Sequence, residues 1–172
     1  MINKLKYTIA SRLIKKKPGV KNFGGILDEA KNIFIIMPED EKDFMNSIKI
    51  IEYLNFLRKD SVVFLNNSAL HLIYNTMNLK IEEYFNSDKS KLQIPKQSLR
   101  IRLKKNKFDL LIDLNRQENF FLSICGMIVK PDFSIGFAKK GADLFYDFQF
   151  AESGNDSEIS YKNLLNCLQM FK

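Results

Sequence analysis

Two short polar segments, each directly after an apolar run, contain the residues whose types and spacing could support chemistry. The segment 38–43 (Pro-Glu-Asp-Glu-Lys-Asp) follows the run 33–37, and the segment 115–119 (Asn-Arg-Gln-Glu-Asn) follows the run 108–114. Continuous apolar runs are typical of β-strands that are covered on both faces. Because ligands bind beyond the carboxyl ends of parallel strands, the two segments are the candidate binding loops.

The first of these segments supplies a candidate general base. A carboxylate at the beginning of a helix can remove a proton from a hydroxyl group if its neighbours adjust its pKa. Asp43 is the candidate base, with Asp40 and Lys42 beside it as candidate substrate contacts. Asp43 could instead serve only as a helix cap or a first-turn acid. Either Asp40 or Asp43 could face the binding site.

Several other kinds of site are not expected. The segment 38–43 contains no glycine, which excludes a GxGxxG dinucleotide turn and a P-loop. The single histidine, His71, has no nucleophile near it in sequence and is expected to be a structural helix residue. Cys125 and Cys167 lie in apolar helical contexts without a CxxC pattern. We therefore expect reduced thiols, no metal site and no cofactor, which favours a cytoplasmic protein.

The excess of positive charge belongs to the N-terminal segment. The net charge is +7, and residues 1–21 contain seven lysine or arginine residues and no acid, whereas the other 151 residues contain 20 basic and 20 acidic side chains. No zinc finger, RNP-type strand or helix-turn-helix pattern is present, so nucleic-acid binding is not expected. Residues 89–107 form a second basic stretch, which we interpret as a surface helix with an apolar side formed by Leu99, Ile101 and Leu103. Its basic face is expected to be solvated or, as the alternative, to attract anions.

The basic N-terminal segment is predicted to form an amphipathic helix that ends at Pro18-Gly19. Its apolar residues recur at spacings of three and four, and they are Ile2, Leu5, Ile9, Leu13 and Ile14. Such a helix could dock on the domain or lie on an anionic membrane surface. Because the sequence contains no run of about 18 apolar residues, we expect a cytoplasmic protein, peripheral at the inner face of the membrane in the second case.

The rest of the chain, residues 30–172, alternates strand and helix patterns. Beyond the two runs above, strands are predicted at residues 62–65, 80–85, 133–137 and 144–150. Helices are predicted at residues 44–57, 69–77, 89–107, 119–129 and 159–170. Because right-handed βαβ crossovers give parallel strands, this order predicts a single Rossmann-like α/β domain with a doubly wound, mainly parallel sheet. Asp109 and Asp113 are interpreted as acids at the ends of a buried strand.

Three motifs of this domain resemble the N-terminal domain of the heptosyltransferase family, glycosyltransferase family nine, which has the GT-B fold and acts on lipopolysaccharide. Lys42-Asp43 stands where the family has a Gly-Asp pair after its first strand. Phe108-Asp-Leu-Leu-Ile-Asp-Leu114 is similar to the family's aromatic-Asp-aliphatic-aliphatic-Asp-Leu strand, and Ser134-Ile-Gly-Phe137 to its Ile-Gly-Phe segment. The resemblance covers residues 33–170.

The resemblance implies a glycosyltransferase-like, acceptor-side domain linked to sugar transfer in the cell envelope. Asp43 would be the base that deprotonates the acceptor hydroxyl, and Asn115, Arg116 and Asn119 would lie on the acceptor side. The family binds its sugar nucleotide mainly in a second domain, and this chain ends where that domain would begin. We therefore expect no stand-alone transfer but a function with a partner domain, which could involve a homo- or hetero-oligomer.

The chain also resembles small single-domain bacterial proteins of the Bacteroidetes type. These combine a basic N-terminal helix, one α/β domain and an Asp-Leu-Leu-Ile-Asp-Leu strand followed by an Asn-rich turn. This second resemblance does not indicate a particular function. The alternative hypothesis is a non-catalytic α/β protein that acts as a binding module or a membrane-apposed interaction module.

Overall fold

The computed structural model describes residues 24–73, 79–152 and 154–171, and these build one parallel sheet. Six strands lie in the order β3-β2-β1-β4-β5-β6, and every neighbouring pair is parallel. They are β1 (Asn32–Ile36), β2 (Asp60–Asn66), β3 (Lys80–Tyr84), β4 (Leu110–Asp113), β5 (Phe133–Phe137) and β6 (Phe148–Phe150). This arrangement confirms the predicted Rossmann-like, doubly wound α/β domain.

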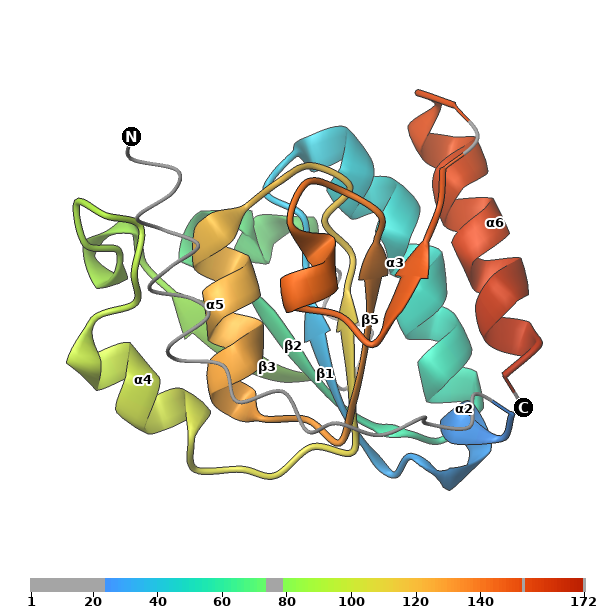
Figure 1. Ribbon diagram of the computed structural model, residues 1–172, viewed down its shortest axis with the longest axis horizontal. Helices are drawn as coiled ribbons and strands as arrows, with labels where there is room; N and C mark the ends of the chain where they lie inside the picture. Colours follow the sequence, from blue (N-terminus) through green and yellow to red (C-terminus); the bar gives the residue numbers. More distant parts are fainter. Residues whose placement is uncertain (1–23, 74–78, 153, 172) are drawn as a thin grey trace.

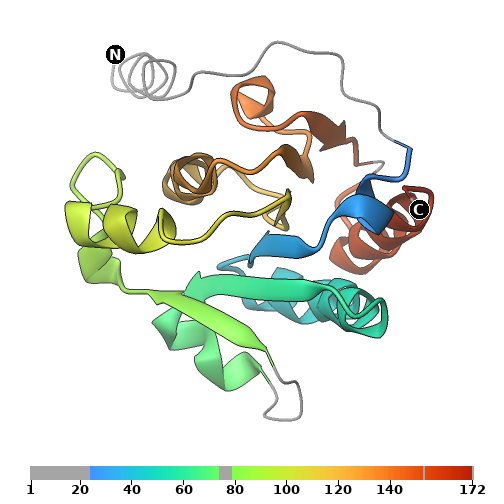
Figure 2. The same ribbon diagram turned by 90° about the horizontal axis from the view of Figure 1, so that it is seen from below.

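Helices cover both faces of the sheet (Figures 1 and 2). The α-helices are α2 (Ile26–Glu29), α3 (Glu41–Phe56), α4 (Gln97–Leu103), α5 (Phe120–Val129) and α6 (Ser157–Gln169), and the 3₁₀ helices are η1 (Asn67–Leu72), η2 (Asn86–Asp88) and η3 (Ala142–Leu144). α3 and α6 pack on one face, where η1 also lies, and α4, α5 and η3 pack on the other. The connection β1–β2 and the described part of the connection β2–β3 therefore lie on one face, and β4–β5 and β5–β6 on the other.

The apolar run of β1 is explained by burial on both sides of the sheet. Ile33, Ile35 and Met37 pack into the core beside α3 and α6, whereas Phe34 and Ile36 pack into the core beside α5. All five side chains are at most 1% exposed. Burial of a side chain of this size contributes about 1.5–3 kcal/mol to folding, so the central strands are the anchor of the fold.

Three of the helices begin at the carboxyl edge of the sheet with a polar cap. Asp40 Oδ1 accepts a hydrogen bond from the Asp43 amide at the beginning of α3, at 2.9 Å. Asn119 Oδ1 accepts from the Leu122 amide at the beginning of α5, at 3.1 Å, and Asp156 caps α6. Such caps satisfy amides that have no partner within the helix, and they fix where each loop ends.

The basic stretch 89–107 differs from the continuous helix that the sequence predicts. Only Gln97–Leu103 is helical, and before it Lys89 and Pro95 form an isolated antiparallel bridge. Pro95 accounts for the late beginning, because proline lacks the amide hydrogen that a helix interior requires. Ile101 is 55% exposed, so the prediction that it belongs to an apolar side of this helix is wrong.

Two further elements are shorter than predicted. In place of an α-helix at 69–77 the structure has the 3₁₀ helix η1, and residues 74–78 lie outside its described part. β6 takes up only the end of the predicted strand 144–150, because Phe145 and Tyr146 turn into the core beside α5.

The predicted N-terminal helix at residues 1–21 lies outside the described residues. Within the described ranges, no helix is long and apolar enough to cross a membrane.

Candidate functional site

The two candidate loops meet at the switch point of the sheet. β1 and β4 are neighbours, but the chain leaves β1 toward the α3 face and leaves β4 toward the α5 face. In doubly wound sheets ligands bind where adjacent strands diverge in this way. Here Asn115 Nδ2 donates to the Met37 carbonyl at 3.3 Å, and Asn119 Nδ2 donates to Glu39 Oε2 at 2.9 Å. The structure thus brings both predicted segments together at the carboxyl edge.

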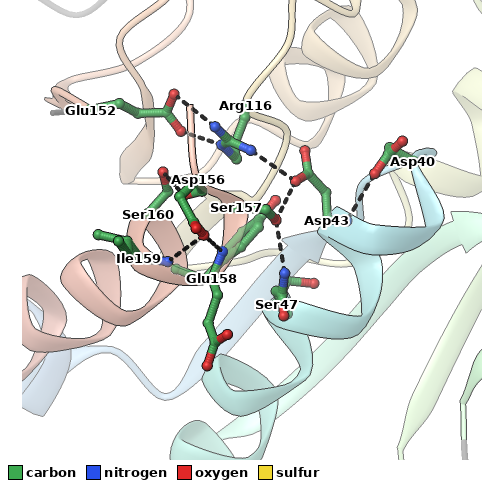
Figure 3. A network of polar contacts seen from close by, with 12 residues as sticks. Asp40, Asp43, Ser47, Arg116, Glu152, Asp156, Ser157, Glu158, Ile159 and Ser160 are labelled. Atoms are coloured by element: carbon green, nitrogen blue, oxygen red, sulfur yellow. Dashed lines mark hydrogen bonds and ion pairs between the residues drawn. The ribbon is translucent and has the colours of Figure 1, made fainter. Parts of the chain in front are cut away.

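Arg116 lies between two carboxylates at this edge (Figure 3). Its Nη1 lies 3.1 Å from Asp43 Oδ1, and its Nε and Nη2 both donate to the carboxylate of Glu152. The Arg116 side chain is only 7% exposed. The hydrogen bonds to Glu152, with a smaller effect from Asp43, raise the pKa of Arg116 despite its burial, so the guanidinium remains charged.

Asp40 and Asp43 have different environments. Asp40 is exposed and caps α3, whereas Asp43 is 6% exposed and belongs to the Arg116 network. Ser157 Oγ donates to Asp43 Oδ1 at 2.5 Å, so both side-chain contacts of Asp43 go to the same oxygen (Figure 3). Lys42 is exposed beside them. Asp43 is therefore held in one orientation, and its role as a base stays a prediction.

The two predicted asparagines support the loop that carries Arg116. Asn115 is buried, and both its amide and its Nδ2 donate to Asp113 Oδ1, at 2.9 and 2.6 Å. The side chain of Asn119 caps α5 through its Oδ1 and also donates a hydrogen bond to Glu39 through its Nδ2. These contacts fix the turn after β4, so the position of Arg116 depends on this turn.

Asp113 is an acid at the end of a strand, as its position in the sequence predicts, and it is also a buried centre of contacts, which the sequence did not reveal. It is the last residue of β4 and is 0% exposed. Tyr146 Oη donates to its Oδ2, and Lys139 Nζ lies 3.2 Å from the same oxygen. Burial and then the charge of Asp113 raise the pKa of Tyr146, so the phenol stays protonated. The only sequence signal was an acid within an apolar run.

Glu39 forms a third group, which the sequence did not reveal. Its Oε1 accepts hydrogen bonds from Tyr84 Oη and Lys89 Nζ, both at 2.6 Å. Lys89 Nζ also lies 5.0 Å from the ring centre of Phe121. Burial acts to raise the pKa of Glu39, but the bonds from Lys89 and Tyr84 outweigh it, so the pKa is lowered. The partners come from β3 and the segment before α4, which no local pattern connects to residue 39.

The edge therefore presents hydrogen-bonding groups whose charges are compensated locally. Three of its cations, Lys89, Arg116 and Lys139, are each paired with a carboxylate. Amide, carboxylate and guanidinium groups at close range are suited to binding hydroxyl groups. Among the residues that the structure describes, no group of three histidine, cysteine, aspartate or glutamate side chains could hold a metal ion.

Comparison with known proteins supports the fold at the level of structure. No protein-family model and no curated protein matches the sequence. Among solved structures, the chain is similar to the glycosyl transferase family 9 from Veillonella parvula DSM 2008, with a TM-score of 0.60 and 12% identity. The match covers 90% of this chain and 44% of that chain. The protein therefore has a glycosyltransferase-like, Rossmann-like α/β fold and spans less than half the length of that structure.

Proposed function

We propose that this chain is the acceptor-side half of a GT-B-type glycosyltransferase and that its carboxyl edge binds a sugar acceptor. The fold is similar to part of a family nine glycosyl transferase, and ligands of doubly wound sheets bind at this edge. The motif resemblance extends the proposal to acceptors of the cell envelope, such as core saccharides of lipopolysaccharide. The sugar nucleotide would then be held by a second domain, in the same or in another chain.

The observation that carries this proposal is the position of Asp43. It lies in the first turn of the helix after β1, at the switch point, and its bonds to Arg116 and Ser157 occupy Oδ1. In the proposed step Oδ2 takes the proton of an acceptor hydroxyl. The hydroxyl oxygen attacks the anomeric carbon of the sugar nucleotide, and the bond to the nucleoside diphosphate breaks. Arg116 and Ser157 would orient the base.

A second candidate function is saccharide or protein binding without catalysis. It is favoured by the ion pair of Asp43 with Arg116, because a carboxylate that neutralises a buried guanidinium stabilises the fold without any reaction. In this case the edge would bind its ligand through exposed groups such as Glu39 and Asp40.

Ligand binding to the full chain and to two matched variants tests the binding site that the carboxyl edge would form. The titration compares wild type, Asp43→Asn and Asp40→Asn, with lipid A-core saccharides and with sugar nucleotides as ligands. Binding is detected by the change in melting temperature and by shifts of amide NMR signals. We expect saccharide-dependent shifts of amides in the loops after β1 and β4, with weaker or no response to sugar nucleotides. The absence of any shift in all three proteins would refute the binding site.

Transfer requires the donor-binding partner, so it is tested after a donor domain or chain has been added. Asp43→Asn should then bind acceptor but lose transfer by about a hundredfold or more, which is the usual contribution of a general base. Asp40→Asn should retain transfer, because Asp40 caps the helix and is not the proposed base. Equal transfer by wild type and Asp43→Asn would show that Asp43 is not the base, whereas no transfer by wild type with the donor partner present would support the non-catalytic function.

We also propose that residues 1–21 attach the chain to an anionic membrane surface at the cytoplasmic side. The support is the charge of this segment, with seven basic residues and no acid. Replacement of Lys15, Lys16 and Lys17 by glutamine in the full chain should weaken co-sedimentation with anionic vesicles. Unchanged co-sedimentation would contradict this role.

A further inference from the structure

α4 and α5 pack side by side on one face of the sheet (Figure 1), and residues of both helices line a groove. The groove has a volume of about 180 Å³. Its apolar lining consists of Ile94, Ile124, Met127 and Ile128. Its cationic lining consists of Arg100, Lys104 and Lys130. The groove therefore combines apolar and cationic lining residues, and none of them belongs to the Arg116 network at the carboxyl edge.

Among the residues that the structure describes, most basic side chains of this face have no ion-pair partner. Residues 89–107 contain eight lysine or arginine side chains and no acid. Lys89 pairs with Glu39 and Arg102 with Glu82. The other six basic residues are exposed, and they are Lys91, Lys96, Arg100, Lys104, Lys105 and Lys107. A surface with this density of unbalanced charge attracts anions over a distance of about a Debye length.

Large aliphatic side chains are exposed among these cations. Leu92 is 45% exposed and Ile101 is 55% exposed. Ile101 also lines a second groove of about 370 Å³ together with Gln97, Arg100 and Lys104. Sequence-independent binding of single-stranded nucleic acid relies on aromatic side chains that stack with bases, whereas the residues that line both grooves are aliphatic, polar or cationic. Aliphatic groups among cations are instead suited to the boundary between phospholipid headgroups and acyl chains.

We infer that the α4–α5 face docks on a bilayer that contains anionic phospholipids. Arg100, Lys104 and Lys130 bind headgroup phosphates, and Ile101 and Leu92 reach the apolar boundary below them. The inference rests on charge complementarity and on the exposed aliphatic side chains, and it does not depend on sugar transfer. It also concerns a surface other than residues 1–21.

Vesicle co-sedimentation of the full chain tests the cationic part of this surface. Binding to vesicles of phosphatidylcholine alone is compared with binding to vesicles of an equimolar mixture of phosphatidylcholine and phosphatidylglycerol. The double variant Arg100→Gln/Lys104→Gln is compared with the control double variant Lys49→Gln/Lys162→Gln. The control pair removes the same charge from α3 and α6, on the opposite face, where both lysines are exposed. We expect binding to the anionic vesicles only, a loss of about tenfold for the α4 variant, and a change within about twofold for the control.

The aliphatic part is tested with Ile101→Ser, which alters an exposed side chain and should leave folding intact. It should weaken vesicle binding severalfold without changing binding to heparin, a soluble polyanion. No binding to anionic vesicles, or equal losses for the two double variants, would overturn the inference. It would also be overturned if heparin or a single-stranded oligonucleotide bound as tightly as the vesicles and Ile101→Ser changed nothing.

Discussion

Arg116 Nη1 lies 3.1 Å from Asp43 Oδ1, while the other side of the same guanidinium binds Glu152. One side chain thereby joins the loop after β4, the first turn of α3 and the segment after β6. The side chains of Arg116, Asp43 and Glu152 are 7%, 9% and 22% exposed. Carboxylates with so little solvent require a cation beside them. Arg116 thus holds the edge together whichever ligand binds there.

Removal of this cation should destabilise the protein strongly. Arg116→Gln leaves Asp43 and Glu152 without their shared partner, and loss of one member of a buried ion pair costs about 3–5 kcal/mol. Urea denaturation at pH 7 measures the loss in the free energy of unfolding. Arg100→Gln is the control, because exposed substitutions usually change stability by less than about 0.5 kcal/mol. A loss below about 1 kcal/mol for Arg116→Gln would show that this network is worth no more than a surface ion pair.

Glu39 should make the protein sensitive to acid. Because its pKa is lowered in the folded state, the unfolded chain binds the proton first as pH falls. Its stabilising contribution is therefore present above the ordinary pKa of a glutamate, about 4.3, and is lost as pH falls through the lowered value. Glu39→Gln should be less stable than wild type at pH 7, and this difference should shrink on acidification. Denaturation over a pH series measures this difference in the free energy of unfolding, and Glu41→Gln, at an exposed position, is the control. A difference that does not change with pH would contradict the prediction.

Three buried tyrosines should resist ionisation until the protein unfolds. Burial is the first cause that raises the pKa of Tyr84, Tyr146 and Tyr161. The unfolded chain loses these protons at a pH of about 10, where the folded protein still keeps them, so stability falls as pH rises above that value. In an ultraviolet titration, at least three of the six tyrosines should ionise together with the loss of circular dichroism. Ionisation of all six before unfolding would contradict the environments of these phenols.

The sequence predicted the elements whose pattern reflects burial, and it missed contacts that depend on strand order. β1 and β4 were recognisable because strands buried on both faces are apolar throughout. The proximity of Asp43 and Arg116 followed from the same strands, since parallel strands present their carboxyl ends at one edge.

The Glu39 group could not be found in this way. Its contact with Tyr84 spans 45 residues and its contact with Lys89 spans 50 residues. Both contacts depend on the strand order, in which β3 lies two strands from β1, and no local sequence pattern predicts this order. The contacts of Asp113 were likewise missed, because its partners Lys139 and Tyr146 follow the next strand and come into reach only when the sheet has formed.

Gly136 of β5 is required by the close approach of Tyr146, and this gives a sharp test of the Asp113 group. A Cβ at position 136 would lie 2.8 Å from three atoms of the Tyr146 ring, too close for a ring that is 3% exposed and held by Asp113. Gly136→Ala should therefore push the ring away from Asp113, at a cost of about 1–3 kcal/mol, as for other overpacked sites. Gly154→Ala, where a Cβ meets nothing within 4 Å, is the matched control and should be nearly neutral. Denaturation measures the difference in the free energy of unfolding, and ultraviolet titration shows whether the displaced phenol ionises at lower pH. A Gly136→Ala protein as stable as the control would mean that Tyr146 does not need its contact with Asp113.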